Sequence, residues 1–147
     1  MELLKPSALN SDMLNSNQNG VPLIICTDAP RVKRVIDNAG YRELKVNEKL
    51  ARSLLEHPKD ERPSLVEKML KSIINNNDSI FVTDFEMLFD PRYEIDALRF
   101  FCEKARMVNI AVKWPGQFAS GKLTYASPED LDYHEFDCNA YQIRIVH

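Results

Sequence analysis

Two acidic residues, Asp84 and Glu86, follow an apolar run that has the character of a buried strand. The run is Ile80-Phe81-Val82, and Thr83 separates it from the first acid. A strand that ends in a carboxylate can hold this group beside the metal ion of a bound nucleotide, while a second acid orients water. Acidic residues also end strands simply because they meet solvent. Asp84 and Glu86 are therefore candidate catalytic residues whose role depends on a phosphate-binding segment elsewhere.

Such a segment is expected directly after the first apolar run, LIIC. The GxxxxGK[ST] loop of P-loop proteins uses glycines because they let successive backbone N–H groups turn toward phosphate. Residues 27–34 of this chain read TDAPRVKR, which keeps the motif's lysine as Lys33. Thr27 and Val32 replace the glycines, and Arg34 replaces the hydroxyl residue that binds Mg²⁺. This degenerate Walker A segment predicts that no conventional Mg²⁺-ATP site forms.

Other residues of the segment also act against a phosphate cradle. Pro30 removes one N–H group, and Asp28 adds a negative charge beside the turn. What remains is a basic cluster at the start of a helix, whose N–H groups attract anions: Arg31, Lys33 and Arg34. Solvated charge on a short helix is one interpretation, and contact with a phosphate of nucleic acid or of a loosely held nucleotide is the other. The candidate cofactor-binding residues are Lys33, Arg34 and Asp84.

The elements that would position these residues alternate between strand and helix. Apolar or alternating runs predict strands at 21–26, 41–47, 80–82, 108–114, 123–126 and 141–146. Apolar residues at helical spacing predict helices at 31–39, 48–56, 64–75 and 95–106. This order predicts an α/β fold of the three-layer, P-loop NTPase-like (Rossmann-like) kind, with a mostly parallel sheet covered by helices on both faces. Ligands of such sheets bind at the carboxyl ends of the strands, so we expect the site at 27–34, 84–86 and 114–116.

Size and composition fit one domain. The chain has 147 residues and a formal net charge of −3, so it has no overall basic field of the kind that drives non-specific duplex binding. Residues 1–20 are expected to form a lead-in that is partly flexible or a short helix, and residues 21–147 the P-loop NTPase-like domain. The absence of a long apolar run or signal-like start predicts a cytoplasmic protein without membrane contact.

The other chemically versatile residues suggest no site. The cysteines lack CxxC spacing, which favours buried thiols over a disulfide framework or a zinc site: Cys26, Cys102 and Cys138. The histidines lack the spacing of a metal motif: His57, His134 and His147. We therefore predict no metal ligands from these residues. Trp114 is more typical of core or rim packing than of a base-stacking platform.

The segment DFEMLFDP, from Asp84 to Pro91, resembles the Walker B segment of BrxF, the small P-loop, ATPase-like protein of BREX bacteriophage-defence systems. Further segments resemble that family in matching order: Arg62-Pro63, Asp96 to Arg99, Trp114-Pro115-Gly116, Lys122 to Ala126 and Asp132 to Asp137. The resemblance covers the chain from about Leu23 to its end. It implies a role in a multi-protein, DNA-associated antiviral defence, with a methyltransferase, a phosphatase-like protein and a large ATPase among the partners.

The resemblance matches Asp84 and Glu86 to the family's Walker B acids and Lys33 to its Walker A lysine. The leading hypothesis is a non-hydrolysing binding or assembly module that contacts other BREX proteins. An ATP-binding or hydrolysing subunit, with ATP and Mg²⁺ as cofactors and a site shared between protomers of a homo-oligomer, is the first alternative. The second is a DNA-binding module, which would use the basic cluster together with Arg42, Lys45 and Lys113 and would release DNA as salt increases.

Overall fold

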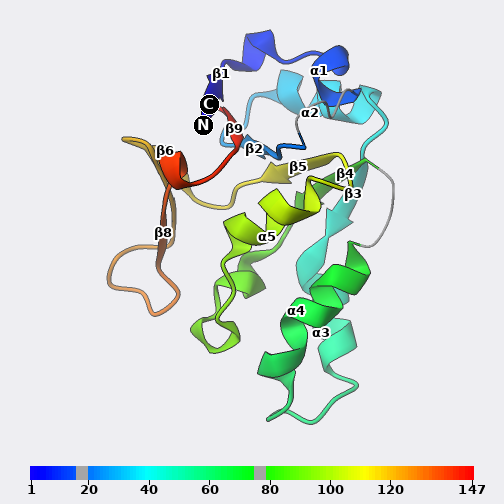
Figure 1. The fold of residues 1–147 in the computed structure, drawn as a ribbon, viewed down its shortest axis with the longest axis vertical. Coiled ribbons are helices and arrows are strands. Elements are labelled where there is room, and N and C mark those ends of the chain that lie inside the picture. Colours follow the sequence, from blue (N-terminus) through cyan, green and yellow to red (C-terminus); the bar gives the residue numbers. More distant parts are fainter. Residues whose placement is uncertain (16–19, 75–78) are drawn as a thin grey trace.

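The structure of the protein, a computed structural model, describes residues 1–15, 20–74 and 79–147. Six strands form one parallel sheet in the order β1-β9-β2-β5-β4-β3 (Figure 1). These strands are β1 (Glu2–Leu4), β2 (Leu23–Ile25), β3 (Arg42–Lys45), β4 (Ile80–Thr83), β5 (Ile110–Lys113) and β9 (Arg144–Val146). The predicted α/β class with a parallel sheet is confirmed.

Helices cover both faces of this sheet, with α1 (Ser11–Asn15) and α2 (Pro30–Asn38) on one face. The opposite face carries α3 (Val46–Leu54), α4 (Arg62–Ile73) and α5 (Ala97–Lys104) (Figure 1). Alternate residues of one strand enter the two apolar layers: Ile24 packs with the α3–α5 layer, whereas Leu23 and Ile25 pack with α2. Burial on both faces explains why the central strands are apolar throughout.

Local sequence explains where the helices begin and end. Pro30 occupies the first position of α2, where its missing N–H costs nothing, and Gly40 beyond the end has a φ of +81°. Asp96 caps α5 by accepting a hydrogen bond from the Arg99 backbone N–H at 2.9 Å. Each predicted helix matches an observed one, with ends shifted by one or two residues. Asn75, the predicted end of the third helix, lies outside the described residues.

The first fifteen residues belong to the same packed unit. β1 pairs with β9 and places Leu3 opposite Ile145, a strand that the sequence does not predict. Leu9 and Leu14 are buried in the same apolar layer as α2. The short helix expected in the lead-in corresponds to α1, preceded by the 3-10 helix η1 (Pro6–Ala8). Residues 16–19 of the predicted lead-in lie outside the described part of the chain.

A second, antiparallel sheet is inserted between β5 and β9. It consists of β6 (Gln117–Ala119), β7 (Lys122–Tyr125) and β8 (His134–Asp137), in that order. Three further 3-10 helices complete the fold: η2 (Glu86–Phe89), η3 (Pro91–Tyr93) and η4 (Cys138–Ala140). The strand predicted at 123–126 lies in this sheet rather than in the parallel one.

Trp114 and Gly116 attach the second sheet to the end of β5. The Trp114 indole Nε1 donates a hydrogen bond to the backbone oxygen of Thr124 at 2.9 Å. A Cβ atom on Gly116 would lie 1.7 Å from that same oxygen, so this position accepts only glycine without a backbone shift. The Trp114 side chain is 2% exposed, which agrees with its expected packing role.

Candidate functional site

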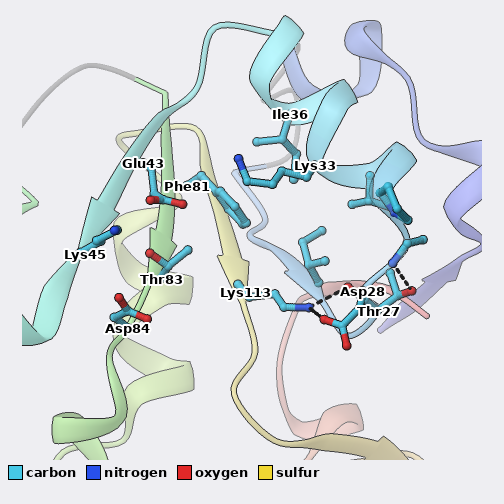
Figure 2. Close-up of a pocket in the computed structure, with 14 residues that line it drawn as sticks. Thr27, Asp28, Lys33, Ile36, Glu43, Lys45, Phe81, Thr83, Asp84 and Lys113 are labelled. Carbon is cyan, nitrogen blue, oxygen red and sulfur yellow. Dashed lines mark hydrogen bonds and ion pairs between the residues drawn. The ribbon is translucent and has the colours of Figure 1, made fainter.

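A groove with a volume of about 440 Å³ lies beside α2, at the carboxyl ends of β2, β4 and β5 (Figure 2). Its apolar lining comes from both the sheet and α2: Ile25, Phe81, Val32 and Ile36. The groove exists because α2 covers β2 and β5, while Glu43 and Lys45 of the edge strand β3 stay exposed on that side. Two of the three expected places, the segments that begin at Thr27 and Asp84, line the groove, whereas Trp114 belongs to the core.

The turn from β2 to α2 is short. β2 ends at Ile25 and α2 begins at Pro30. Lys33 is therefore the fourth residue of the helix, and not the last residue of a phosphate-binding loop. The Thr27 hydroxyl accepts a hydrogen bond from the Ala29 backbone N–H at 3.2 Å, which fixes the turn locally. Only residues 26–29 connect the two elements, and a connection of that length leaves few backbone N–H groups to direct at a polyphosphate chain.

Lys113 at the end of β5 reaches across to this turn. Its ammonium donates hydrogen bonds to the Thr27 carbonyl oxygen at 2.7 Å and to Asp28 Oδ1 at 2.6 Å (Figure 2). The hydrogen bond and the charge of Lys113 lower the pKa of the Asp28 carboxyl below its usual value. The Asp28 side chain is 98% exposed and that of Lys113 is 33% exposed, so solvent screens this ion pair.

The basic cluster predicted from the sequence does not converge on the groove. The Arg31 guanidinium donates to the Pro6 carbonyl oxygen of the N-terminal segment. Lys33 lines the groove, and its ammonium pairs with Asp37 one helical turn further along α2, at 3.1 Å. Arg34 is exposed on α2 and is not part of the groove lining. Of the three predicted phosphate contacts, Lys33 is the one that the groove includes.

The two predicted acids also separate. Asp84 lines the groove and turns the chain with a φ of +48°, a left-handed conformation that is strained for a non-glycine residue. Glu86 is held by Asn47 instead: the Asn47 amide Nδ2 donates to Glu86 Oε2 at 2.7 Å, and its Oδ1 accepts from the Met87 backbone N–H at 3.0 Å. Glu86 is not part of the groove lining, so Asp84 has no second predicted acid beside it there.

Metal and thiol chemistry find no support in the described ranges 1–15, 20–74 and 79–147. No group of three or more His, Cys, Asp or Glu residues in them could hold a metal ion. The three cysteines are free, and burial raises the pKa of the Cys26 thiol to about 12 and that of Cys102 to about 11. Both thiols are therefore protonated near neutral pH and react poorly as nucleophiles.

Thr83 offers a stability test at the edge of the groove. Its Oγ1 is buried and makes no hydrogen bond within the described part of the chain. We expect Thr83→Val to raise the free energy of unfolding by about 1 kcal/mol, because the substitution removes an unsatisfied polar atom and nearly keeps the shape. The matched control is Thr27→Val, which should lower stability because the Thr27 hydroxyl accepts the Ala29 N–H. Urea unfolding would measure both, and a destabilised Thr83→Val would show that the hydroxyl has a partner.

The fold and the groove together define an α/β protein with a six-stranded parallel sheet and a binding-sized groove at the carboxyl ends of its strands. No protein-family model, curated protein or solved structure matches the chain. Every helix among the described residues is too short or too polar to span a bilayer.

Proposed function

We propose that the chain is a non-hydrolysing binding or assembly module with a P-loop-type fold, acting in a BREX-type antiphage defence system. The observation that carries the non-hydrolysing part is the hydrogen bond that the Lys113 ammonium donates to the Thr27 carbonyl oxygen, at 2.7 Å. It ties down the turn that a P-loop protein would leave open for phosphate. The module acts by binding, and its ligand or partner is held at the groove.

The strand order supports the P-loop relationship. β5 lies between β2 and β4, and the turn after β2 and the acid after β4 still reach one groove. Lys33 on α2 and Asp84 after β4 thus line the same groove, although 51 positions separate them in the sequence. Parallel α/β sheets bind ligands at this edge, outside the carboxyl ends of their strands.

The surroundings of Asp84 support binding without hydrolysis. In-line attack by water on a phosphoryl group needs a residue that orients the water, as well as a metal-bound phosphate. Glu86 was the sequence candidate for that role, but it is not part of the groove lining. Its carboxylate Oε2 instead accepts a hydrogen bond from Asn47 Nδ2 at 2.7 Å. Pro30 and the short turn reduce the backbone donors available for phosphate.

Assignment to a BREX-type system rests on the order of the sequence segments that resemble BrxF. Many of these segments meet around one aromatic cluster. In it, the centroid of the Phe89 ring lies 5.6 Å from that of Trp114 and 4.2 Å from that of Tyr125. The segments therefore specify how η2 packs on the second sheet, which is a property that relatives of one fold would share. We propose other defence proteins as the partners of the module, with self-association and DNA as the alternatives that experiment should separate.

An ATPase assay tests this proposal directly. We expect the purified protein with Mg²⁺-ATP to release no more phosphate than Asp84→Asn, because the groove lacks a complete hydrolytic set. In calorimetry with ATP, the wild-type protein and Lys33→Ala should give the same heat, because no ATP binding depends on Lys33. Hydrolysis that disappears in Asp84→Asn would contradict the proposal and favour the ATPase alternative.

Mass measurement in solution separates the partner classes. With ATP or a DNA duplex added, we expect the mass of the wild-type protein to stay unchanged. A complex with duplex that dissociates steeply between low and moderate salt would favour the DNA-binding alternative, because displaced counterions set that slope. A larger assembly formed only with ATP would favour a site shared between protomers.

A further inference from the structure

We propose that the groove binds an anionic group at the ammonium of Lys113, in the place that the Asp28 carboxylate occupies. This inference rests on the proposed function, because it takes the groove as the binding site of the module. It adds the chemistry of the ligand, a small phosphate or carboxylate on an apolar body, and gives Asp28 the role of an internal competitor.

The contacts of Lys113 provide the first step. A lysine ammonium has three donors, and here one is directed to the Thr27 carbonyl oxygen and one to Asp28 Oδ1, at 2.7 and 2.6 Å. The hydrogen bond to the Thr27 carbonyl oxygen keeps the Lys113 ammonium beside the groove whether or not Asp28 stays in place. A ligand oxygen could therefore replace the carboxylate oxygen without moving the lysine.

The difference in exposure provides the second step. Asp28 projects into solvent with 98% of its side chain exposed, whereas the Lys113 side chain is two-thirds covered, with 33% exposed. A solvent-exposed ion pair contributes little to stability, so release of Asp28 costs little. The Asp28 carboxylate is thus the partner that a ligand can displace, while the hydrogen bond to the Thr27 carbonyl oxygen holds the ammonium.

The charges of the groove limit what can replace Asp28. Three lysines and three acids line it: Lys33, Lys45, Lys113, Asp28, Glu43 and Asp84 (Figure 2). When Asp28 turns away, one positive charge is left unbalanced. A group of low negative charge restores the balance, while a triphosphate would meet Glu43 and Asp84 with several charges of the same sign. The apolar lining, Phe81 among it, favours an anion attached to an apolar body.

Two probes with the same apolar body test the proposal: benzoate and phenyl phosphate. Trp114, the single tryptophan of the chain, directly follows Lys113, so its fluorescence can report binding beside calorimetry. We expect Asp28→Asn to bind at least one probe about two- to fivefold more tightly than wild type, the range that a surface ion pair can supply. Lys113→Met should bind neither probe, and Lys113→Arg should retain binding because it keeps the positive charge.

Lys122→Met is the matched control, since Lys122 forms an equally short pair with Glu135, 2.6 Å, on the second sheet. It should bind the probes like wild type. Equal affinity of Asp28→Asn and wild type, binding retained in Lys113→Met, or no binding by any variant would each overturn the proposal. Tighter binding of benzoate assigns a carboxylate ligand, and tighter binding of phenyl phosphate assigns a phosphate. The probe-binding experiment contains no nucleotide. A positive ATPase assay would therefore refute the proposed function but would leave the result of the probe-binding experiment unchanged.

Discussion

Gly116→Ala is expected to lower the free energy of unfolding by about 3 kcal/mol, at the upper end of the usual cost of overpacking. The added Cβ would lie 1.7 Å from the Thr124 oxygen and 2.8 Å from its carbonyl carbon. These are backbone atoms of β7, which is paired on both sides, so they cannot yield as a flexible side chain would. Moving them would also break the Trp114 hydrogen bond to the same oxygen. Guanidinium unfolding would measure the effect.

Gly121→Ala is the control, because Gly121 lies in the same second sheet region but has open space around it. Its φ of +75° is left-handed, and an added Cβ would meet nothing within 4 Å. Only the conformational cost of an alanine in that region should appear, about 1–2 kcal/mol. Equal losses in the two variants would show that the close approach at Gly116 does not determine its cost.

The parallel sheet could be predicted from the sequence because its central strands are buried on both faces. The apolar runs around Ile24, Val82 and Val112 are each bounded by polar or turn residues, and helical spacing separates them. β1, with Leu3 on its exposed side, is three residues long and carries no periodic signal. Of the second sheet the sequence predicted only β7, as the strand at 123–126, because Leu123 and Tyr125 alternate with polar residues. β6 is three residues long with Gln117 exposed, and neither it nor β8 was predicted.

The candidate site could be predicted in position but not in its contacts. Asp84 and Lys33 line the groove, as the rule for the carboxyl ends of parallel strands predicts. The Lys113–Asp28 pair joins residues 85 positions apart, and no local pattern in the sequence predicts it. The pair forms because β5 lies directly beside β2, and that strand order is a property of the whole sheet. Asn47 and Glu86, 39 positions apart, were brought together in the same way.

The aromatic residues of the segment after Asp84 and of the second sheet have a structural role that the sequence alone does not reveal. Phe89 comes from the segment after Asp84, while Tyr125 and Phe136 come from β7 and β8 of the second sheet. Their rings meet in one cluster with Trp114. Aromatic packing therefore helps to hold the second sheet against the end of β5, with Phe89 in contact with Trp114 and with Tyr125 and Phe136 of the second sheet.

Phe89→Ala is accordingly expected to lower the free energy of unfolding by about 4 kcal/mol, the cost of removing a fully buried ring from a packed core. Hydrogen exchange should accelerate more in β7 and β8 than in β2 and β5, because the lost contacts include the stacked Tyr125 ring at 4.2 Å. Phe118→Ala is the control, since Phe118 is only half-buried on β6 and should cost about 1 kcal/mol. Equal acceleration in both sheets of Phe89→Ala would mean that they unfold as one unit, and that this ring does not join two separable parts.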